Sequence, residues 1–158
     1  MRMPGRKQGF LPSINPRFAC FRLRVGRSRK DRFGVYACEV IPLGRKVIEY
    51  TGKVLSLHEF NREFERKYHG RPPRRLYGMS LSRKLVVDAS RQGCGAEYIN
   101  HSCEPNLFVR RHGGHALLFS LRRIARGEEL CYDYQLPRGW KAPCRCGSSR
   151  CRGMLNLR

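Results

Sequence analysis

Asn100-His101-Ser102-Cys103-Glu104-Pro105-Asn106 gives the strongest indication of how this chain is built, because its cysteine has counterparts near the C-terminus. The second cluster is Cys144-x-Cys146-x4-Cys151, in which one short loop carries three thiols. Closed structural zinc sites take four tetrahedral ligands, and thiolates suit the ion well. A fourth ligand must come from elsewhere in the chain, and Cys103 is our candidate. Four other cysteines compete for this role: Cys20, Cys38, Cys94 and Cys131.

A disulfide scaffold is the alternative explanation for these cysteines. It requires an oxidising compartment, and proteins of that kind usually carry a secretory signal. Residues 1–17 instead form a basic extension, interrupted by Pro4, Pro12 and Pro16, with no apolar stretch. The sequence therefore favours structural zinc and predicts an intracellular protein with no membrane partner.

The net charge of +21 over 158 residues is the second unusual feature. Basic residues are spread along the whole chain, with a local maximum over residues 22–32, where Asp31 is the one acidic residue. A field of this sign attracts phosphate backbones and other anionic surfaces. The maximum is compatible with a nucleic-acid patch, a targeting signal or a solvated basic face, and charge alone does not choose among them.

The chain length suits one domain, and the hydrophobic fraction of 41% is adequate for a core. Short apolar or alternating runs, separated by Gly and Pro, predict strands. These runs cover residues 21–25, 33–40, 46–54, 85–88, 107–110 and 116–121. The chain lacks the GxGxxG turn and the strand and helix alternation of a doubly wound fold. We therefore predict a mainly β domain.

One helix is predicted after Ser56, which forms a capping box with Glu59. Its apolar residues recur on one face at helical spacing: Leu57, Phe60, Phe64 and Tyr68. The helix should end before Gly70, because Pro72 and Pro73 cannot continue it. A basic connection follows, made by Arg71, Arg74 and Arg75. We interpret residues 56–75 as an exposed insertion whose aromatic stripe packs against the core.

Three motifs in order carry a resemblance to a known family: Tyr98–Asn106, Gly127–Tyr134 and the cysteine tail with Leu155-Asn156. Together they resemble SET-domain protein-lysine methyltransferases. Val86-Val87-Asp88-Ala89 and the tail are most similar to the trithorax or mixed-lineage-leukaemia type. The resemblance runs from about Phe21 to Arg158.

The resemblance implies a fold of several small curved sheets with a pseudoknot, one inserted helix and a C-terminal zinc-binding post-SET loop. It divides the chain into a basic extension at 1–17, a SET domain at 18–137 and a post-SET segment at 138–158. The zinc would be structural, and its ligands would be Cys103, Cys144, Cys146 and Cys151.

The resemblance also implies S-adenosylmethionine as cofactor. Asn100 and His101 would contact its adenosine part, and the loop Asp31-Arg32-Phe33-Gly34 its methionine end. Arg145 and Leu155 would touch it from the post-SET loop. The family usually has Gly-x-Gly in the first loop, which permits close backbone approach. Here Arg32 replaces the first glycine, so a side chain projects from a position that the family leaves bare.

For catalysis, the resemblance assigns the catalytic tyrosine to Tyr134, a position that limits the number of methyl groups to Tyr132, and a lysine-channel tyrosine to Tyr77, which also borders the cofactor. A tyrosine at position 132 implies mainly monomethyl-lysine. The peptide would add as a strand in a groove formed partly by the insertion. Three carboxylates lie near the motifs and are candidates to contact a basic peptide: Glu97, Glu104 and Asp133.

Three functions from different classes stay open at this point. The first is an active methyltransferase on a histone tail or another basic nucleic-acid-associated protein, aided by an activating protein partner as in trithorax-type relatives. The second is a catalytically silent SET-like binding module, which Arg32 favours. The third is a basic nucleic-acid-associated zinc protein, which explains the charge but not the motifs. The expected location is the nucleus or chromosome in a eukaryote, and the cytoplasm or nucleoid in a prokaryote.

Overall fold

The computed structural model describes residues 12–69, 75–136 and 142–155. Its larger sheet has the strand order β1-β2-β10-β8-β9-β3, with β7 paired to β10, and its smaller sheet has the order β4-β6-β5. The strands of the larger sheet are β1 (Leu23–Arg27), β2 (Phe33–Ala37), β3 (Lys46–Tyr50), β7 (Asn100–His101), β8 (Leu107–His112), β9 (His115–Ser120) and β10 (Glu129–Tyr132). Those of the smaller sheet are β4 (Lys53–Ser56), β5 (Gly78–Ser80) and β6 (Leu85–Asp88). Two short 3-10 helices, η1 (Pro16–Phe18) and η2 (Ala96–Tyr98), precede β1 and β7.

Strand β10 is the centre of the arrangement. It pairs antiparallel with β2 and parallel with both β7 and β8. The backbone amides of Ser102 and Asn106 also donate to the carbonyls of Tyr132 and Cys131, at 3.2 Å each. The Asn100–Asn106 segment therefore lies directly against the end of β10, as the resemblance implied.

The core lies inside the curled larger sheet, where β2, β3 and β10 contain only buried and half-buried residues. The largest fully buried aliphatic side chains are Val35, Ile41, Val47, Ile48, Ile99, Leu107, Leu118, Ile124 and Leu130. Burying each such side chain stabilises the fold by about 1.5–3 kcal/mol. This core stabilises β10 and the strands paired with it, and thereby positions residues 133–136, which follow β10.

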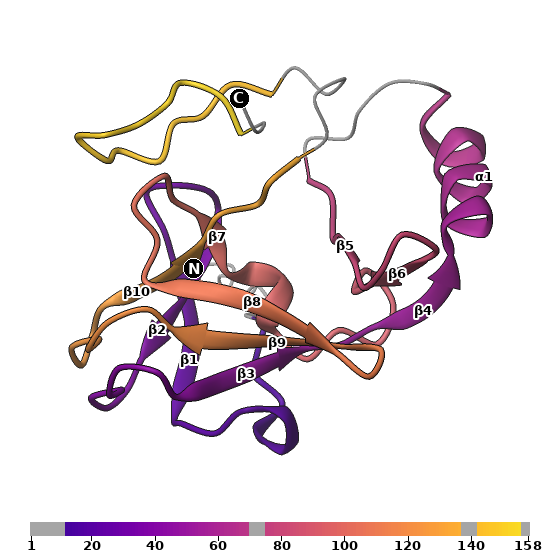
Figure 1. Ribbon diagram of the computed structural model, residues 1–158. Helices are drawn as coiled ribbons and strands as arrows, with labels where there is room; N and C mark the ends of the chain where they lie inside the picture. Colours follow the sequence, from indigo (N-terminus) through magenta and orange to yellow (C-terminus); the bar gives the residue numbers. More distant parts are fainter. Residues whose placement is uncertain (1–11, 70–74, 137–141, 156–158) are drawn as a thin grey trace, which may run out of the picture.

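Helix α1 (Leu57–Tyr68) lies at one side of the molecule, beyond the smaller sheet (Figure 1). The predicted capping box is present: the Ser56 hydroxyl accepts from the Glu59 amide, and the Glu59 carboxylate accepts from the Ser56 amide. The helix ends at Tyr68, as predicted, and His69 adopts a left-handed conformation with φ 50°. The predicted stop signals at Gly70, Pro72 and Pro73 lie outside the described residues, as do Arg71 and Arg74.

The predicted packing of the aromatic stripe holds only in part. No residue of α1 is buried, and the helix contacts β4 and β6 of the small sheet. Its aromatic face is half-buried and borders a cavity instead of the core.

Strand boundaries differ from the sequence pattern at several places. The run 46–54 is two strands in two sheets, separated at Thr51-Gly52, and 33–40 ends as a strand at Ala37. Strands β5, β7 and β10 were not predicted, because they are two to four residues long and are stabilised by pairing with distant segments. No helix in the described part of the chain is long and apolar enough to cross a membrane.

Candidate active site and metal centre

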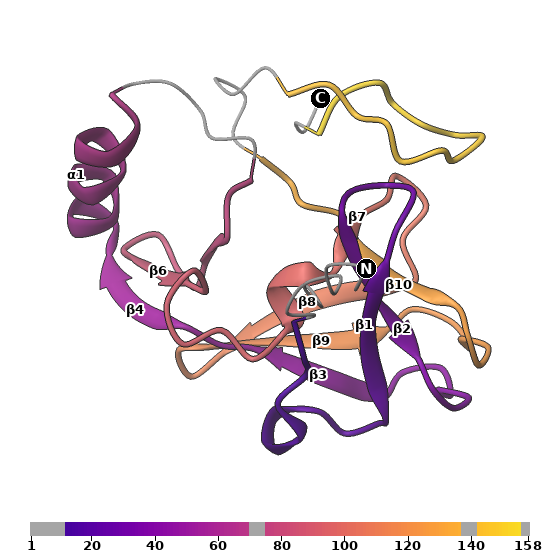
Figure 2. The same cartoon turned by 180° about the vertical axis from the view of Figure 1, so that it is seen from behind.

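A cavity of about 1550 Å³ separates three parts of the molecule: the β7 and β10 ends with the loop before β2, the α1 and β5 side, and the C-terminal segment 142–155. Both views show the C-terminal segment above β7 and helix α1 at the opposite edge of the molecule (Figures 1 and 2). Ten of the eleven residues predicted for catalysis or cofactor binding line this cavity, as do the predicted metal ligands Cys144 and Cys146. The ten are Asp31, Arg32, Phe33, Tyr77, Asn100, His101, Tyr132, Tyr134, Arg145 and Leu155.

The Asn100 side chain holds the loop between β1 and β2 against the start of β10. Its amide Nδ2 lies 2.8 Å from the Phe33 carbonyl, 2.8 Å from Glu129 Oε1 and 3.2 Å from Ser28 Oγ. Lys30 Nζ adds an ion pair to Glu129 at 3.5 Å. The loop that was predicted to meet the cofactor is therefore fixed in place by the amide side chain, and Figure 2 shows it rising beside β7.

Gly34 is the one residue predicted for the cofactor that is not among the residues lining the cavity. A Cβ at this position would collide with the Glu129 carboxylate and the Ser28 side chain. The missing side chain makes room for the contact between Glu129 and Ser28, in which the Ser28 hydroxyl donates to Glu129 Oε1 at 2.7 Å. The glycine thus supports the loop from behind.

Arg32 and Asp31 have distinct surroundings. Asp31 accepts two hydrogen bonds from Arg75, from Nε at 2.7 Å and from NH2 at 2.6 Å. The Arg32 guanidinium lies 5.0 Å from the ring centroid of Phe33, which makes an edge contact with Tyr98 at 5.9 Å. The side chain that replaces the family's glycine therefore rests on an aromatic ring at the cavity lining.

Tyr132 and Tyr134 form an aromatic pair at the end of β10, with ring centroids 4.8 Å apart. The Tyr134 hydroxyl donates to the Ile99 carbonyl at 2.9 Å. Burial raises the pKa of both phenols above the usual range. Both side chains are therefore neutral at physiological pH and act as hydrogen-bonding groups, not as bases.

Two further tyrosines, Tyr50 and Tyr98, line the cavity beside Tyr77. The Tyr50 hydroxyl donates to the Tyr77 carbonyl at 2.9 Å, and the Tyr98 ring lies 6.1 Å from that of Tyr77. Sequence reasoning gave neither residue a role in the site. Tyr98 stands inside the quoted motif, which could have suggested it, whereas Tyr50 ends an ordinary strand pattern.

Three of the four predicted metal ligands, Cys103, Cys144 and Cys146, come together from two distant parts of the chain, and the fourth member of the group is His101 instead of Cys151. Ligand atoms of His101, Cys103, Cys144 and Cys146 all lie within 4.8 Å of one another. The Sγ atoms of Cys103 and Cys144 are 3.7 Å apart, close to the separation of about 3.8 Å that tetrahedral Zn–S bonds of ~2.3 Å require. Cys151 Sγ lies 3.8 Å from the Cys144 carbonyl and interacts with the Cys144 and Cys146 thiols.

Protonation of the cluster also fits a metal. Burial would raise the pKa of Cys146, but hydrogen bonds from the amides of Cys103 and Ser148 and from neighbouring thiols lower it to about 6. One thiolate is thus favoured even before a cation is added, and soft thiolates are the donors that zinc prefers. The competing cysteines lie elsewhere: Cys94 Sγ donates to the Glu49 carbonyl, Cys131 is buried in β10, and Cys20 and Cys38 flank β1 and β2.

His101 connects this cysteine cluster to the tyrosines. Its Nδ1 accepts a hydrogen bond from the Tyr134 amide at 3.3 Å, and its Nε2 lies 3.3 Å from Cys103 Sγ. Nδ1 also lies 3.6 Å from Asp133 Oδ1. The tautomer protonated on Nε2 would direct its proton at the sulfur, and the tautomer protonated on Nδ1 would leave Nε2 free to bind a metal. Burial lowers the pKa of His101 to about 4, so the ring is neutral. The sequence predicted a cofactor contact for this residue and missed its contact with the cysteine.

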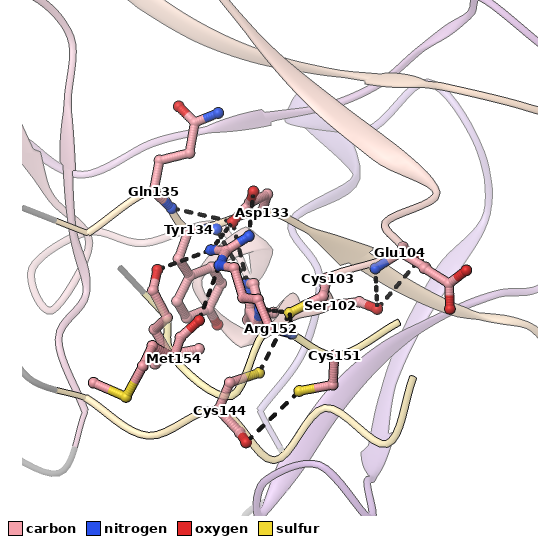
Figure 3. Close-up of polar contacts among 12 residues, drawn as sticks. Ser102, Cys103, Glu104, Asp133, Tyr134, Gln135, Cys144, Cys151, Arg152 and Met154 are labelled. Atoms are coloured by element: carbon pink, nitrogen blue, oxygen red, sulfur yellow. Dashed lines mark hydrogen bonds and ion pairs between the residues drawn. The ribbon is translucent and has the colours of Figure 1, made fainter. Parts of the chain in front are cut away.

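Arg152 attaches the C-terminal segment to the end of β10 (Figure 3). Its guanidinium makes two hydrogen bonds to Asp133, at 2.8 and 2.6 Å. It also donates to the carbonyls of Met154 and Leu155 at 2.9 Å each, and its amide donates to Cys103 Sγ at 3.5 Å. Asp133, between the two tyrosines, is thus engaged with Arg152, and nothing in the sequence pattern identified this pair.

Comparison with known proteins places the chain in a family. The family model described as SET domain matches residues 32–135. The chain belongs to the SET-domain family. It is 42% identical over 138 residues to the histone-lysine N-methyltransferase trithorax of Drosophila virilis and 42% identical over 140 residues to the human histone-lysine N-methyltransferase 2B. These matches cover 84% of this chain but only 4% and 5% of the relatives.

Solved structures agree with this assignment. The methyltransferase domain of human SETMAR superposes with a TM-score of 0.73 at 27% identity, over 91% of this chain and 61% of that one. KRYPTONITE, in complex with mCHG DNA and SAH, gives a TM-score of 0.71 at 30% identity, over 87% of this chain and 29% of that one. The mainly β SET-domain fold and the trithorax-type likeness are confirmed. The family match ends before the cysteine tail, so the post-SET assignment of 138–158 stays a prediction.

Proposed function

We propose that this protein is an S-adenosylmethionine-dependent protein-lysine N-methyltransferase. The observation that carries the proposal is the cavity of a SET-domain chain in which the loop before β2, the Asn100–His101 strand and the tyrosines of β10 meet. Relatives named as histone-lysine N-methyltransferases and a structural neighbour solved with SAH support the same chemistry.

The tyrosines would hold the lysine amine in line with the methyl group. The cofactor, when bound, supplies a methyl group on a positively charged sulfur. A lysine amine must be neutral to attack, although its ordinary pKa is about 10.4. The buried phenols of Tyr132 and Tyr134 carry no charge that would stabilise an ammonium ion, and burial disfavours that ion further. Tyr134 and Tyr77 therefore contribute orientation and electrostatics, not proton abstraction.

Zinc would be held by Cys103, Cys144, Cys146 and Cys151, with His101 Nε2 beside Cys103. Its contribution would be structural: it would fix the C-terminal segment that carries Arg145 and Leu155 to the cavity. The grouping of donor atoms and the sulfur spacing support Cys103, Cys144 and Cys146, whereas Cys151 rests on the resemblance.

The product is expected to be mainly monomethyl-lysine. The Tyr132 ring lies against Tyr134, and a hydroxyl at this position can retain a water that crowds a methylated amine. Mass spectrometry of the product checks this, with Tyr132→Phe as the comparison. The wild type should stop at one methyl group and the variant should continue, whereas predominant trimethylation by the wild type would contradict the assignment.

The substrate is expected to be a histone tail or another basic protein associated with nucleic acid, in the nucleus if the organism is a eukaryote. The names of the relatives and the DNA-bound neighbour support this. Because an enzyme of net charge +21 repels a free basic tail, nucleic acid is the partner expected to bring the two together. An activating protein partner is expected at α1, which has no buried residue.

Transfer of a labelled methyl group from S-adenosylmethionine to core histones and to nucleosomes tests the function. The wild type should label a lysine, and Tyr134→Phe should reduce labelling strongly while cofactor affinity is kept. A folded, zinc-loaded protein that binds cofactor but labels no protein, with or without an activating partner, would instead support the silent binding module.

A further inference from the structure

Arg111 brings a positive charge into the cavity beside the tyrosines, a cavity that Lys30, Arg32, Arg75 and Arg145 also line. It lies near the end of β8, the strand whose Leu107 pairs with Tyr132. Its side chain lines the same cavity as Tyr132 and Phe60. The guanidinium is near enough to Tyr132 to oppose, slightly, the rise that burial causes in the pKa of that phenol. The charge therefore lies in the same cavity to which the proposed function assigns the substrate lysine.

The Arg111 head group is held in place by the smaller sheet. Its Nε donates to the carbonyl of Ser80, at the end of β5, at 2.6 Å. This bond spans the two sheets and fixes the plane of the guanidinium, because the fork of donors in arginine is rigid. With Nε engaged, the two terminal nitrogens remain as a pair of donors, the geometry that binds a carboxylate or phosphate in two places.

No carboxylate of the described residues forms an ion pair with Arg111, although four line the cavity. Asp31 is bound by Arg75 and Asp133 by Arg152. Glu97 accepts from the Gly95 amide, and Glu65 lies on α1 without an ion pair in the described part of the chain. Arg111 is exposed, so its terminal donors are accessible from solvent and can pair with an anion that arrives with the ligand.

We propose that Arg111 binds an anionic side chain of the substrate, a carboxylate or a phosphate, within a few residues of the lysine that is methylated. The inference rests on the proposed function for the identity of the bound chain. The aromatic groove residues Phe60, Phe64 and Phe108 would contact the apolar parts of the same segment. An acidic residue beside the lysine would also lower the net positive charge of a segment that the enzyme otherwise repels.

A set of lysine peptides tests the proposal. Each peptide carries one test residue, which is glutamine, glutamate or phosphoserine. Across the set, this residue is placed in turn at each position within a few residues before or after the lysine. Binding is measured by fluorescence anisotropy with S-adenosylhomocysteine present, and methyl transfer is measured in parallel. At one position the glutamate or phosphoserine peptide should bind about tenfold more tightly than the glutamine peptide, the ratio that one charge-assisted hydrogen bond supplies. The two anionic arms distinguish a carboxylate substrate from a phosphorylated one.

Arg110→Gln is the matched control for Arg111→Gln. Arg110 is the preceding residue of β8, it lies 4.9 Å from the Phe119 ring outside the cavity lining, and its loss changes the net charge equally. Arg111→Gln should abolish the preference and Arg110→Gln should keep it. Arg111→Glu should favour a peptide with lysine at the same position.

Two results would overturn the inference: a wild type that does not distinguish the peptides at any position, or an equal loss of preference in both variants, which would indicate only the general field. The readouts also separate the two proposals. A preference in binding without methyl transfer would keep the role of Arg111 and contradict the catalytic function. Transfer without any preference would do the reverse.

Discussion

The C-terminal segment 142–155 and helix α1 are two walls of the same cavity, held by different forces. The C-terminal segment is joined to the rest by polar contacts: the cysteine cluster, the Arg152–Asp133 pair and the hydrogen bond from the Ser148 hydroxyl to Glu104. Helix α1 contacts the small sheet with a half-buried aromatic face and has one ion pair to the loop after β6, Glu63–Arg91 at 2.8 Å.

Because the contacts differ, each wall should control a different property of the site. The C-terminal wall borders the residues predicted for the cofactor, and its contacts are made by charged groups and thiols. The helical wall borders the part of the cavity proposed for the substrate and depends on contacts such as that between Phe60 and Gly78, where even a Cβ would lie 2.6 Å from the ring. Substitutions in the C-terminal wall should therefore weaken cofactor binding. Substitutions in the helical wall should weaken substrate binding and leave cofactor binding unchanged.

The largest effect is expected from Cys146→Ser or from chelation of the metal. Structural zinc contributes about 10–16 kcal/mol in isolated zinc-finger peptides, so its loss should release the C-terminal wall. Methyl transfer should fall by more than about 100-fold. Hydrogen exchange over 142–155 should rise while β8 and β9 stay protected. Cys20→Ser, at an exposed cysteine outside the cluster, should change neither readout.

A smaller loss is expected from Arg152→Met. Breaking a buried ion pair costs about 3–5 kcal/mol, and the Arg152 and Asp133 side chains keep only 16% and 26% of their exposure, so most of this cost applies. Cofactor affinity should fall by about 10- to 100-fold with the zinc content unchanged. The matched control is Arg150→Met. The Arg150 side chain is 82% exposed, and its ion pair to Glu104 is longer, with Nε 3.7 Å from Oε1. Equal losses in both variants would show that charge, and not the contact with Asp133, matters.

Phe60→Ala examines the helical wall. The ring is half-buried, so its removal should cost about 1–2 kcal/mol, less than a fully buried aromatic residue. The KM for a lysine substrate should rise about tenfold, with cofactor affinity unchanged. Arg62→Ala, on the exposed side of the same helix, serves as the control. A parallel loss of cofactor affinity in Phe60→Ala would contradict the separation of the two walls.

The smallest effect is expected from Ser56→Ala, which removes the capping box. Such a cap stabilises a helix by about 1 kcal/mol. Hydrogen exchange of the first turn of α1 should become several-fold faster, and the C-terminal segment should show no change. Faster exchange over 142–155 would mean that the two walls are coupled through the small sheet.

The sequence predicted best what depends on neighbouring residues. The capping box of Ser56 and Glu59 needs only four residues, and both partners were found. The resemblance also predicted that the motifs around Asn100 and Tyr134 would lie in one site, and both line the same cavity. It could do so because a family resemblance carries information about tertiary structure that residue spacing does not contain. The extra split at Thr51-Gly52 was missed, since an apolar run has the same pattern whether it continues or turns into a second sheet.

Side-chain partners far apart in the chain could not be predicted. The Arg152–Asp133 pair joins residues of common type in a chain with 33 basic residues, so no pattern marks this arginine among the others. The contact between His101 and Cys103 joins residues only two apart, yet the resemblance assigned the two side chains to different ligands, so it was not predicted either. Gly34 stays a predicted cofactor residue, and the structure adds that its lack of a side chain accommodates Glu129.

Calorimetric titration of S-adenosylmethionine into the zinc-loaded protein tests the central claim most directly, because it requires no knowledge of the substrate. The wild type should show saturable binding at one site. Asn100→Ala should lose it, because the loop before β2 is released, and Asn61→Ala, on the α1 wall, should retain it. Absence of binding by the folded, zinc-loaded wild type would contradict the proposed methyltransferase and would identify Arg32 as the first residue to replace with glycine.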